Sequence, residues 1–432
     1  MRLLLFTVCI AINLTDIYAQ NPQSKWMKYN TPEEAGFSSE KLKKVDELYI
    51  QNGADALLII YKGNVLYSKG EIFRRFDCHS IRKSLLSAVY GIYSDKEIID
   101  INKTLNEIGI DDKIGLTENE KSATISDLLK SKSGIYIPAL GESKSMSESR
   151  PDRGSHQPGE YFYYNNWDFN ALNSIFMKET GLDIAKAFYV SIAQPLKMED
   201  FRQFDSRLWL DSKIETIHPK LDIKISARDL ARFGLLYCNN GIWSNEVFIS
   251  KEWISKSFSP YSTFNYNDYS ESYGFMWWIE NIDDSLEVYS GRGWGGHILT
   301  IVPDQDLVLV KRHDTYKKGS TGGDGWSGKY IRAIINAKIS NCKVEPVLFP
   351  LAEAPPLVLD TISLTFKELI AYEQEVFYKG RIRQIQSNGV NLIFDDNFIL
   401  HPISKDKFYV EDYDMYMYFT FENNKPKFSR IE

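Results

Sequence analysis

Residues 80–93 read Ser-Ile-Arg-Lys-Ser-Leu-Leu-Ser-Ala-Val-Tyr-Gly-Ile-Tyr in a chain of 432 residues. Their apolar side chains recur at positions 81, 85, 86, 89, 92 and 93, a spacing that predicts a helix with a buried face. Residues three apart share one face of a helix, so the amine of Lys83 can lie against the hydroxyl of Ser80. A partly buried lysine beside other cations has a lowered pKa and can take a proton from serine. The alternative is that Ser80 caps the helix and Lys83 is a solvated charge.

The Ser-x-x-Lys spacing is a weak signal by itself, because it also occurs at Ser38/Lys41, Ser340/Lys343 and Ser404/Lys407. Only Ser80 opens a strongly apolar helix, whose N-terminus also favours a developing negative charge. This context singles out Ser80 and Lys83 as the candidate nucleophile and base.

The pattern on either side of this helix predicts an α+β (mixed α/β) fold. A hairpin and two further helices are expected, at 56–61 with 65–67, at 168–178 and at 226–238. Short strands rich in β-branched and aromatic residues return at 273–280, 286–290, 297–303 and 307–312. Strands at both ends with helices between them must share one sheet, which excludes an alternating βαβ order.

The composition divides the chain into three parts. Residues 1–19 have a positive start at Arg2 and a mostly apolar run that is too short for a membrane span, which is typical of a signal peptide. Export to the periplasm or the extracellular space is therefore expected. A proline-marked linker around 349–356 separates a main domain over 20–345 from a small β-rich domain over 357–432.

The charge and the metal-binding residue types exclude several functions. A net charge of -7 without a basic cluster argues against nucleic acid as a partner. Outside residues 1–19 only three cysteines remain, with no Cys-x-x-Cys pair, which excludes a disulfide framework. The six histidines show no metal-ligand spacing, so we expect neither a metal site nor a cofactor.

A second segment, Pro158 to Asn166, places a Tyr-x-Asn sequence on a turn before a helix. The phenol of Tyr164 and the amide of Asn166 would lie side by side there. With Lys83 nearby, a phenolate-leaning Tyr164 would relay protons between Ser80 and a leaving group. The alternative is an aromatic turn that packs in the core.

A third segment, Gly293-Trp294-Gly295-Gly296-His297, leads directly into a predicted strand. Glycines let a substrate lie against the strand edge, and a backbone N–H at the strand start can face an oxyanion. A simple hairpin turn is the alternative.

In this order, the three segments resemble the motifs of the penicillin-recognising serine hydrolases: class C β-lactamases, DD-peptidases and related esterases. The resemblance covers about residues 30–340. It includes three further segments, Leu128-Leu129-Lys130-Ser131-Lys132-Ser133-Gly134, Ser226-Ala227-Arg228-Asp229-Leu230-Ala231-Arg232-Phe233-Gly234 and Tyr273-Gly274-Phe275-Met276-Trp277-Trp278.

The resemblance implies a role for each motif residue. Ser80 would be the nucleophile that forms an acyl-enzyme, and Lys83 and Tyr164 would transfer its proton. Asn166 would bind the substrate amide or orient Lys83, and the backbone N–H groups of Ser80 and His297 would form the oxyanion hole. The implied fold is a mostly antiparallel sheet flanked by helices beside a helical region, with the site between them.

One departure bears on the substrate. Trp294-Gly295-Gly296 stands where β-lactamases carry the lysine that meets the substrate carboxylate, and it looks more like the esterase branch. A buried carboxylate needs a partner, so β-lactams are disfavoured as substrates. Three nearby basic side chains either replace that cation or are solvated loop charges: Arg153, His156 and Arg292.

The sequence therefore predicts an exported serine hydrolase that acts on an ester, an amide or a peptide. A β-lactamase or DD-peptidase is the alternative within the same class. A non-catalytic ligand or cell-wall binding protein on the same fold is the alternative from another class.

Overall fold

The computed structural model describes residues 21–22, 25–211, 213–265, 270–282, 285–317, 323, 325–354, 358–378, 381–395, 398–410 and 415–431. The predicted signal peptide over 1–19 lies outside them. Among the helices described, none is long and apolar enough to cross a membrane.

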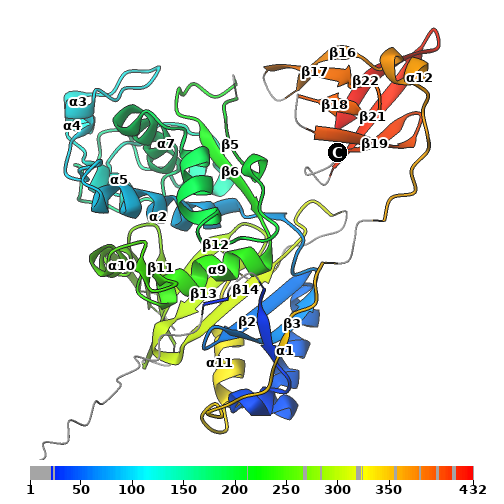
Figure 1. The fold of residues 1–432 in the computed structure, drawn as a ribbon. Helices are drawn as coiled ribbons and strands as arrows, with labels where there is room; N and C mark the ends of the chain where they lie inside the picture. The colour runs from blue at the N-terminus through cyan, green and yellow to red at the C-terminus, as the bar shows by residue number, and fades with distance from the viewer. Residues whose placement is uncertain are drawn as a thin grey trace, which may run out of the picture.

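A ten-stranded sheet forms the centre of the main domain (Figure 1). Every pair of neighbouring strands is antiparallel except β1 with β3, which confirms the mostly antiparallel α+β fold. Strands from both ends of the chain do share this sheet, because β2 pairs with β14. In spatial order the strands are β15 (Leu348–Pro350), β1 (Met27–Tyr29), β3 (Asn64–Gly70), β2 (Ala56–Tyr61), β14 (Leu307–Arg312), β13 (His297–Val302), β12 (Leu286–Gly293), β11 (Trp278–Ile282), β10 (Ser270–Tyr273) and β9 (Ser262–Asn265).

Helices cover both faces of this sheet, and the central strand β2 shows why. All six of its residues are buried, and alternate side chains point to opposite faces. Leu57 and Ile59 pack with α1 (Ser39–Asn52) and α11 (Gly328–Ala337) on one face. Leu58 and Ile60 belong to the cluster that includes α9 (Ala227–Cys238) on the other face.

A helical region and a small three-stranded sheet lie beyond α9 (Figure 1). The small sheet runs in the order β4 (Phe76–Asp77), β6 (Lys220–Ile225) and β5 (Ser206–Trp209). The helices are α2 (Arg82–Asp95), α3 (Leu105–Ile108), α4 (Glu118–Lys121), α5 (Ile125–Leu129), α6 (Lys144–Glu148), α7 (Asn166–Thr180), α8 (Ile184–Phe188) and α10 (Lys251–Ser257), and a hairpin joins β7 (Ile242–Trp243) to β8 (Glu246–Val247).

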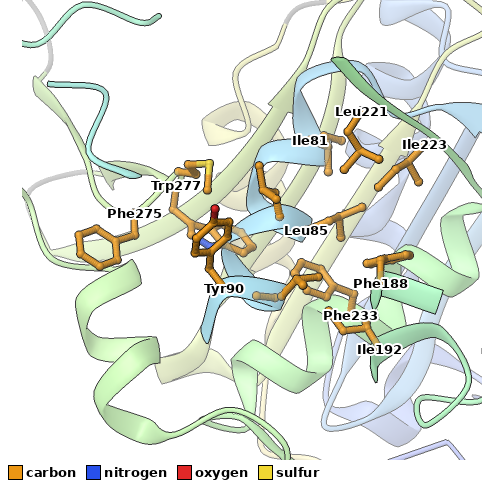
Figure 2. Close-up of a cluster of buried hydrophobic side chains, with 14 of the residues drawn as sticks. Ile81, Leu85, Tyr90, Phe188, Ile192, Leu221, Ile223, Phe233, Phe275 and Trp277 are labelled. Atoms are coloured by element: carbon orange, nitrogen blue, oxygen red, sulfur yellow. The ribbon is translucent and has the colours of Figure 1, made fainter. Parts of the chain in front are cut away.

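Helix α2 is the element that joins the two regions. Figure 2 shows its side chains Leu85 and Tyr90, with Ile81 directly before it, among apolar groups from both sides. Phe188 comes from the helical region, and Trp277 comes from the segment between β10 and β11. The start of α2 is therefore held at the boundary between the sheet and the helices.

The strand predicted over 273–280 is wrong in its middle, because β10 ends at Tyr273 and β11 begins at Trp278. The backbone N–H of Gly274 donates to the carbonyl of Trp277 at 2.9 Å, which turns the chain. A Cβ at Gly274 would lie 2.0 Å from the carbonyl oxygen of Ser257. Close packing against the end of α10 therefore overrides the strand preference of these aromatic residues.

The C-terminal unit is a separate antiparallel meander of seven strands around its own apolar core. Its first and last strands approach each other, because the side chain of Gln374 accepts a hydrogen bond from the N–H of Phe428 at 2.8 Å. This brings the sheet close to a barrel. Its elements are α12 (Phe366–Ala371), β16 (Gln374–Tyr378), β17 (Arg381–Ser387), β18 (Leu392–Phe394), β19 (Phe398–Ser404), β20 (Lys407–Val410), β21 (Met415–Glu422) and β22 (Lys425–Ile431).

Candidate active site

Ser80 lies in a 3-10 turn, η2 (His79–Ile81), that leads directly into α2. His79 before it has a φ of 47°, a left-handed conformation that a residue with a side chain rarely adopts. The His79 ring is fixed by a hydrogen bond of 2.9 Å to the hydroxyl of Thr315. A strained backbone held by its surroundings at this position is typical of a functional site.

Lys83 connects the first two sequence motifs. Its Nζ lies 2.9 Å from Ser80 Oγ and 2.8 Å from the hydroxyl of Tyr164. The structure thus brings together the three side chains that the sequence singled out, although they come from positions up to 84 residues apart (164 − 80).

The surroundings of Lys83 favour its neutral form. The side chain is buried, and its Nζ lies 4.3 Å from the ring centre of Tyr164 and 4.6 Å from that of Phe169. Burial lowers the pKa of Lys83 well below its usual value, and the charges of Arg82 and Lys220 lower it further. A neutral amine can accept the proton of Ser80.

Tyr164 differs from the sequence-based expectation of a phenolate-leaning side chain. Burial raises the pKa of Tyr164 above its usual value, and the hydrogen bond from Ser80 and the charges of Arg82 and Arg292 only oppose this rise. Tyr164 is therefore a neutral phenol near pH 7. It can donate a proton while it accepts one, and the phenolate form that a base requires is disfavoured.

The segment from Leu128 to Gly134, one of the further segments in the resemblance, supports the turn that carries Tyr164. Ser131 donates from its hydroxyl to the carbonyl of Tyr163 at 2.7 Å and accepts from the N–H of Asn165 at 2.9 Å. Ser133 donates to the buried carboxyl of Asp168 at 2.5 Å. These contacts fix the turn and the start of α7.

Asn166 is buried with an unsatisfied acceptor. Its side-chain oxygen has no hydrogen-bond partner among the residues that the structure describes, and only 2% of Asn166 is exposed. A buried acceptor without a donor is unfavourable, so it invites a donor from a bound molecule or from water. This suits the predicted role of Asn166 in binding a substrate N–H.

The third motif forms the turn from β12 into β13. Gly295 and Gly296 have φ values of 83° and 87°, which glycine adopts without strain. A Cβ at Gly293 would lie 2.7 Å from the carbonyl oxygen of Cys78, so the end of β12 packs tightly against the turn that carries Ser80. Both β12 and β13 contact η2. Trp294 is 66% exposed, and its ring lies at 5.5 Å from that of His79.

The side chain of His297 has a structural role. It is fully buried, and its Nδ1 accepts from Arg312 Nε at 3.0 Å. Burial and the charge of Arg312 lower the pKa of His297 well below its usual range, so the ring stays neutral. Arg312 also donates to the carbonyls of Phe76 and Ile225, at 2.9 and 3.0 Å, and so ties the small sheet to β13 and β14.

Two of the three nearby basic side chains form ion pairs with glutamates. Arg153 forms two hydrogen bonds of 2.8 and 2.7 Å with the carboxylate of Glu120. Arg292 pairs with Glu271 and Glu280, each at 2.7 Å. The ring of His156 stacks on that of Tyr161 at 4.2 Å. Arg153 is exposed in a loop, as the alternative of a solvated loop charge predicts, whereas Arg292 lies in β12 with only 21% of its side chain exposed.

The structure adds a cation that the sequence motifs did not indicate. Lys220 on β6 is largely buried, pairs with Asp222 and lies over the ring of Trp209 at 5.2 Å. It approaches Asn166, because a Cβ on Gly141 would contact both of these side chains. The alternation in Lys220–Ile225, with the odd-numbered positions buried, was the available signal that its polar residues share one face.

A family described as beta-lactamase matches residues 55–317, more than half of the chain. No curated protein matches the chain significantly. Solved structures share its fold at low sequence identity. They include an octameric penicillin-binding protein homologue from Pyrococcus abyssi (17% identity, 91% of this chain and 98% of that chain, TM-score 0.52). A protein from Bacillus anthracis, assigned as a 6-aminohexanoate-dimer hydrolase, is similar over 72% of this chain and 90% of its own (20% identity, TM-score 0.54). A penicillin-binding protein homologue from Caulobacter crescentus is similar over 70% of this chain and 99% of its own (13% identity, TM-score 0.52).

Proposed function

Because the chain belongs to the β-lactamase family of serine hydrolases, we propose that it is an exported enzyme that cleaves an ester or amide bond through an acyl-enzyme on Ser80. The observation that carries this proposal is the position of Lys83 Nζ, which lies within hydrogen-bond distance of Ser80 and of Tyr164. A buried neutral amine in that position is the base that a serine nucleophile requires.

Acylation uses all three side chains. Ser80 Oγ attacks the substrate carbonyl carbon while its proton passes to Lys83 Nζ. The proton then moves through Tyr164 to the leaving oxygen or nitrogen, the bond to the leaving group breaks, and the ester with Ser80 remains. The backbone N–H groups of Ser80 and His297 are proposed to hold the oxyanion. Asn166 is proposed to receive an N–H or hydroxyl of the substrate.

Deacylation reverses the direction of proton transfer. A water molecule attacks the acyl carbon and gives a proton to the Lys83–Tyr164 pair. The bond between the acyl group and Ser80 Oγ breaks, and the proton returns to the serine. The products are the free acid and a restored Ser80.

Esters are the first substrate class to test, because Trp294-Gly295-Gly296 lacks the cation found in β-lactamases. Lys220, which approaches Asn166 although it pairs with Asp222, favours a second candidate, a β-lactam or peptide with a free carboxylate. Hydrolysis of a chromogenic cephalosporin, compared with that of p-nitrophenyl acetate, distinguishes the two. If Lys220 binds the carboxylate, Lys220→Met lowers cephalosporin hydrolysis and leaves acetate hydrolysis much less affected.

The decisive experiment is intact-mass measurement after exposure to a fluorophosphonate. Ser80 would displace fluoride and form a stable phosphonate ester, so the wild-type protein should gain one adduct and Ser80→Ala none. Ser38→Ala is the matched control, because Ser38 has the same Ser-x-x-Lys spacing but its hydroxyl caps α1. This control should label like the wild type.

Absence of an adduct on every protein would overturn the hydrolase proposal. The alternative of a non-catalytic ligand or cell-wall binding protein would then be favoured. Export is tested separately, by N-terminal sequencing of the protein recovered from the periplasm or medium of a bacterial host. We expect the sequence to begin at Gln20, and retention of Met1 would contradict cleavage of a signal peptide.

A further inference from the structure

A cavity of about 1440 Å³ lies beside the candidate active site, and no catalytic motif accounts for it. His79, which precedes Ser80, and Lys220 line it. Trp209 and Tyr316 line its sides. Pockets for small ligands usually measure about 300–1,000 Å³, so this cavity has room for much more than a short acyl group.

The C-terminal unit contributes to the lining of this cavity. Phe377 on β16 and Met415 on β21 line it together with the main-domain residues. Phe377 is 72% exposed, so its ring presents apolar surface to the open cavity. The unit is also anchored next to the cavity, because the rings of Phe204 and Phe398 make an edge contact at 4.6 Å. In Figure 1 the C-terminal sheet accordingly lies beside β5 and β6.

The charges in the cavity nearly balance. Five basic and four acidic side chains line it, and they include the ion pairs Lys220–Asp222 and Arg74–Asp314. A ligand therefore finds little net charge there. Beside these charges, seven aromatic and aliphatic side chains from both units line the cavity and can contact an apolar ligand segment: Trp209, Leu210, Ile217, Ile223, Tyr316, Phe377 and Met415.

We propose that this cavity binds an extended apolar arm of the substrate, and that Phe377 and Met415 select for the length of that arm. The inference rests on the proposed function of Ser80, because it assigns the cavity to the same reaction. The substrate is the expected occupant because His79 lines the cavity and directly precedes Ser80 in the same turn. The C-terminal unit is then a specificity element of the enzyme.

The test compares p-nitrophenyl acetate with p-nitrophenyl decanoate on the full protein. In the double variant Phe377→Ala/Met415→Ala we expect kcat/KM for the decanoate to fall about tenfold, the usual effect of losing apolar contact with a substrate. Hydrolysis of the acetate should stay within about twofold of wild type. Phe366→Ala is the matched control, because this phenylalanine of the same unit is 59% exposed and does not line the cavity. Its chain-length profile should equal that of the wild type.

A second series, acetate esters of alcohols of increasing length, assigns the arm. If the double variant loses the chain-length preference of the wild type in the acyl series, the acyl group lies in the cavity. If it loses that preference in the alcohol series, the leaving group lies there. If the double variant keeps both wild-type profiles while acetate hydrolysis continues, the cavity assignment is wrong and the function of Ser80 stands. If the wild type neither hydrolyses esters nor labels with fluorophosphonate, the proposed function fails and the cavity assignment fails with it.

Discussion

The contact between Gly293 and the turn that carries Ser80 leads to a sharp prediction about geometry. Gly293 has no positive φ, so alanine is allowed by its backbone conformation. Its new Cβ, however, would lie 2.7 Å from the carbonyl oxygen of Cys78 and 3.0 Å from the Cβ of His297. Both neighbours belong to packed elements and cannot rotate away, so the end of β12 has to move.

The size of that movement follows from the distances. An ordinary contact of this kind begins at 3.4 Å, so the backbone must separate by about 0.7 Å (3.4 − 2.7). Misplacement of catalytic groups by about 1 Å can lower a rate by about 100-fold, so we expect Gly293→Ala to lower kcat by about 10- to 100-fold. The overpacking should also lower the free energy of unfolding by about 1–3 kcal/mol.

The assay is kcat on p-nitrophenyl acetate, together with the rate of fluorophosphonate labelling and urea unfolding. Both chemical rates should fall, because both depend on the oxyanion position at the start of β13. Gly325→Ala is the matched control, because its Cβ meets nothing within 4 Å and it has no positive φ. Wild-type rates and stability in Gly293→Ala would refute the idea that this packing sets the geometry at Ser80.

Three further variants test the electrostatics. Lys220→Met removes a charge that lowers the pKa of Lys83, so the acid limb of the pH profile of kcat/KM should move to higher pH. The shift should be less than about one pH unit, because Asp222 already offsets the charge of Lys220. Lys83→Met removes the proposed base, so kcat on p-nitrophenyl acetate should fall by about 10²- to 10⁴-fold. Between the lowered pKa of Lys83 in the folded protein and its usual value of 10.5, the unfolded state binds more protons than the native state, so the stability of the wild type rises with pH. Lys83→Met lacks this contribution, so its free energy of unfolding relative to that of the wild type should decline as pH rises through the same range. Parallel curves of stability against pH for the two proteins would contradict this. Arg312→Met leaves His297 Nδ1 and backbone carbonyls of the small sheet without their donor, so urea unfolding should show a loss of about 3 kcal/mol or more, and a loss below about 1 kcal/mol would contradict this role.

The features that the sequence predicted well have a local cause. The helix after Ser80 and the helix beginning at Asn166 follow from apolar spacing and from capping residues within a few positions. The Ser80–Lys83 pair is likewise set by one helical turn. Tyr164 was placed beside them only through the resemblance to a family, because nothing local joins residues 81 positions apart.

The features that the sequence did not predict depend on packing between distant segments. Lys220 reaches the site because β6 pairs with β4, which directly precedes the turn of Ser80. The prediction of a phenolate-leaning Tyr164 was wrong for a similar reason, because the raised pKa of Tyr164 comes from its burial in the complete fold. The break between β10 and β11 follows from contact of Gly274 with the end of α10.

A comparison of two Ser-x-x-Lys segments shows which surroundings make a serine with this spacing reactive. Ser38 and Lys41 have the same separation as Ser80 and Lys83, and both pairs lie at the start of a helix. Lys41, however, is exposed, and only its backbone N–H bonds to the Ser38 hydroxyl, at 3.3 Å. Lys83 is covered by Tyr164 from another segment, and that burial lowers its pKa. The reactivity expected of Ser80 therefore depends on the packing of the helical region over α2, and a substitution that uncovers Lys83 should reduce activity even where every catalytic side chain remains.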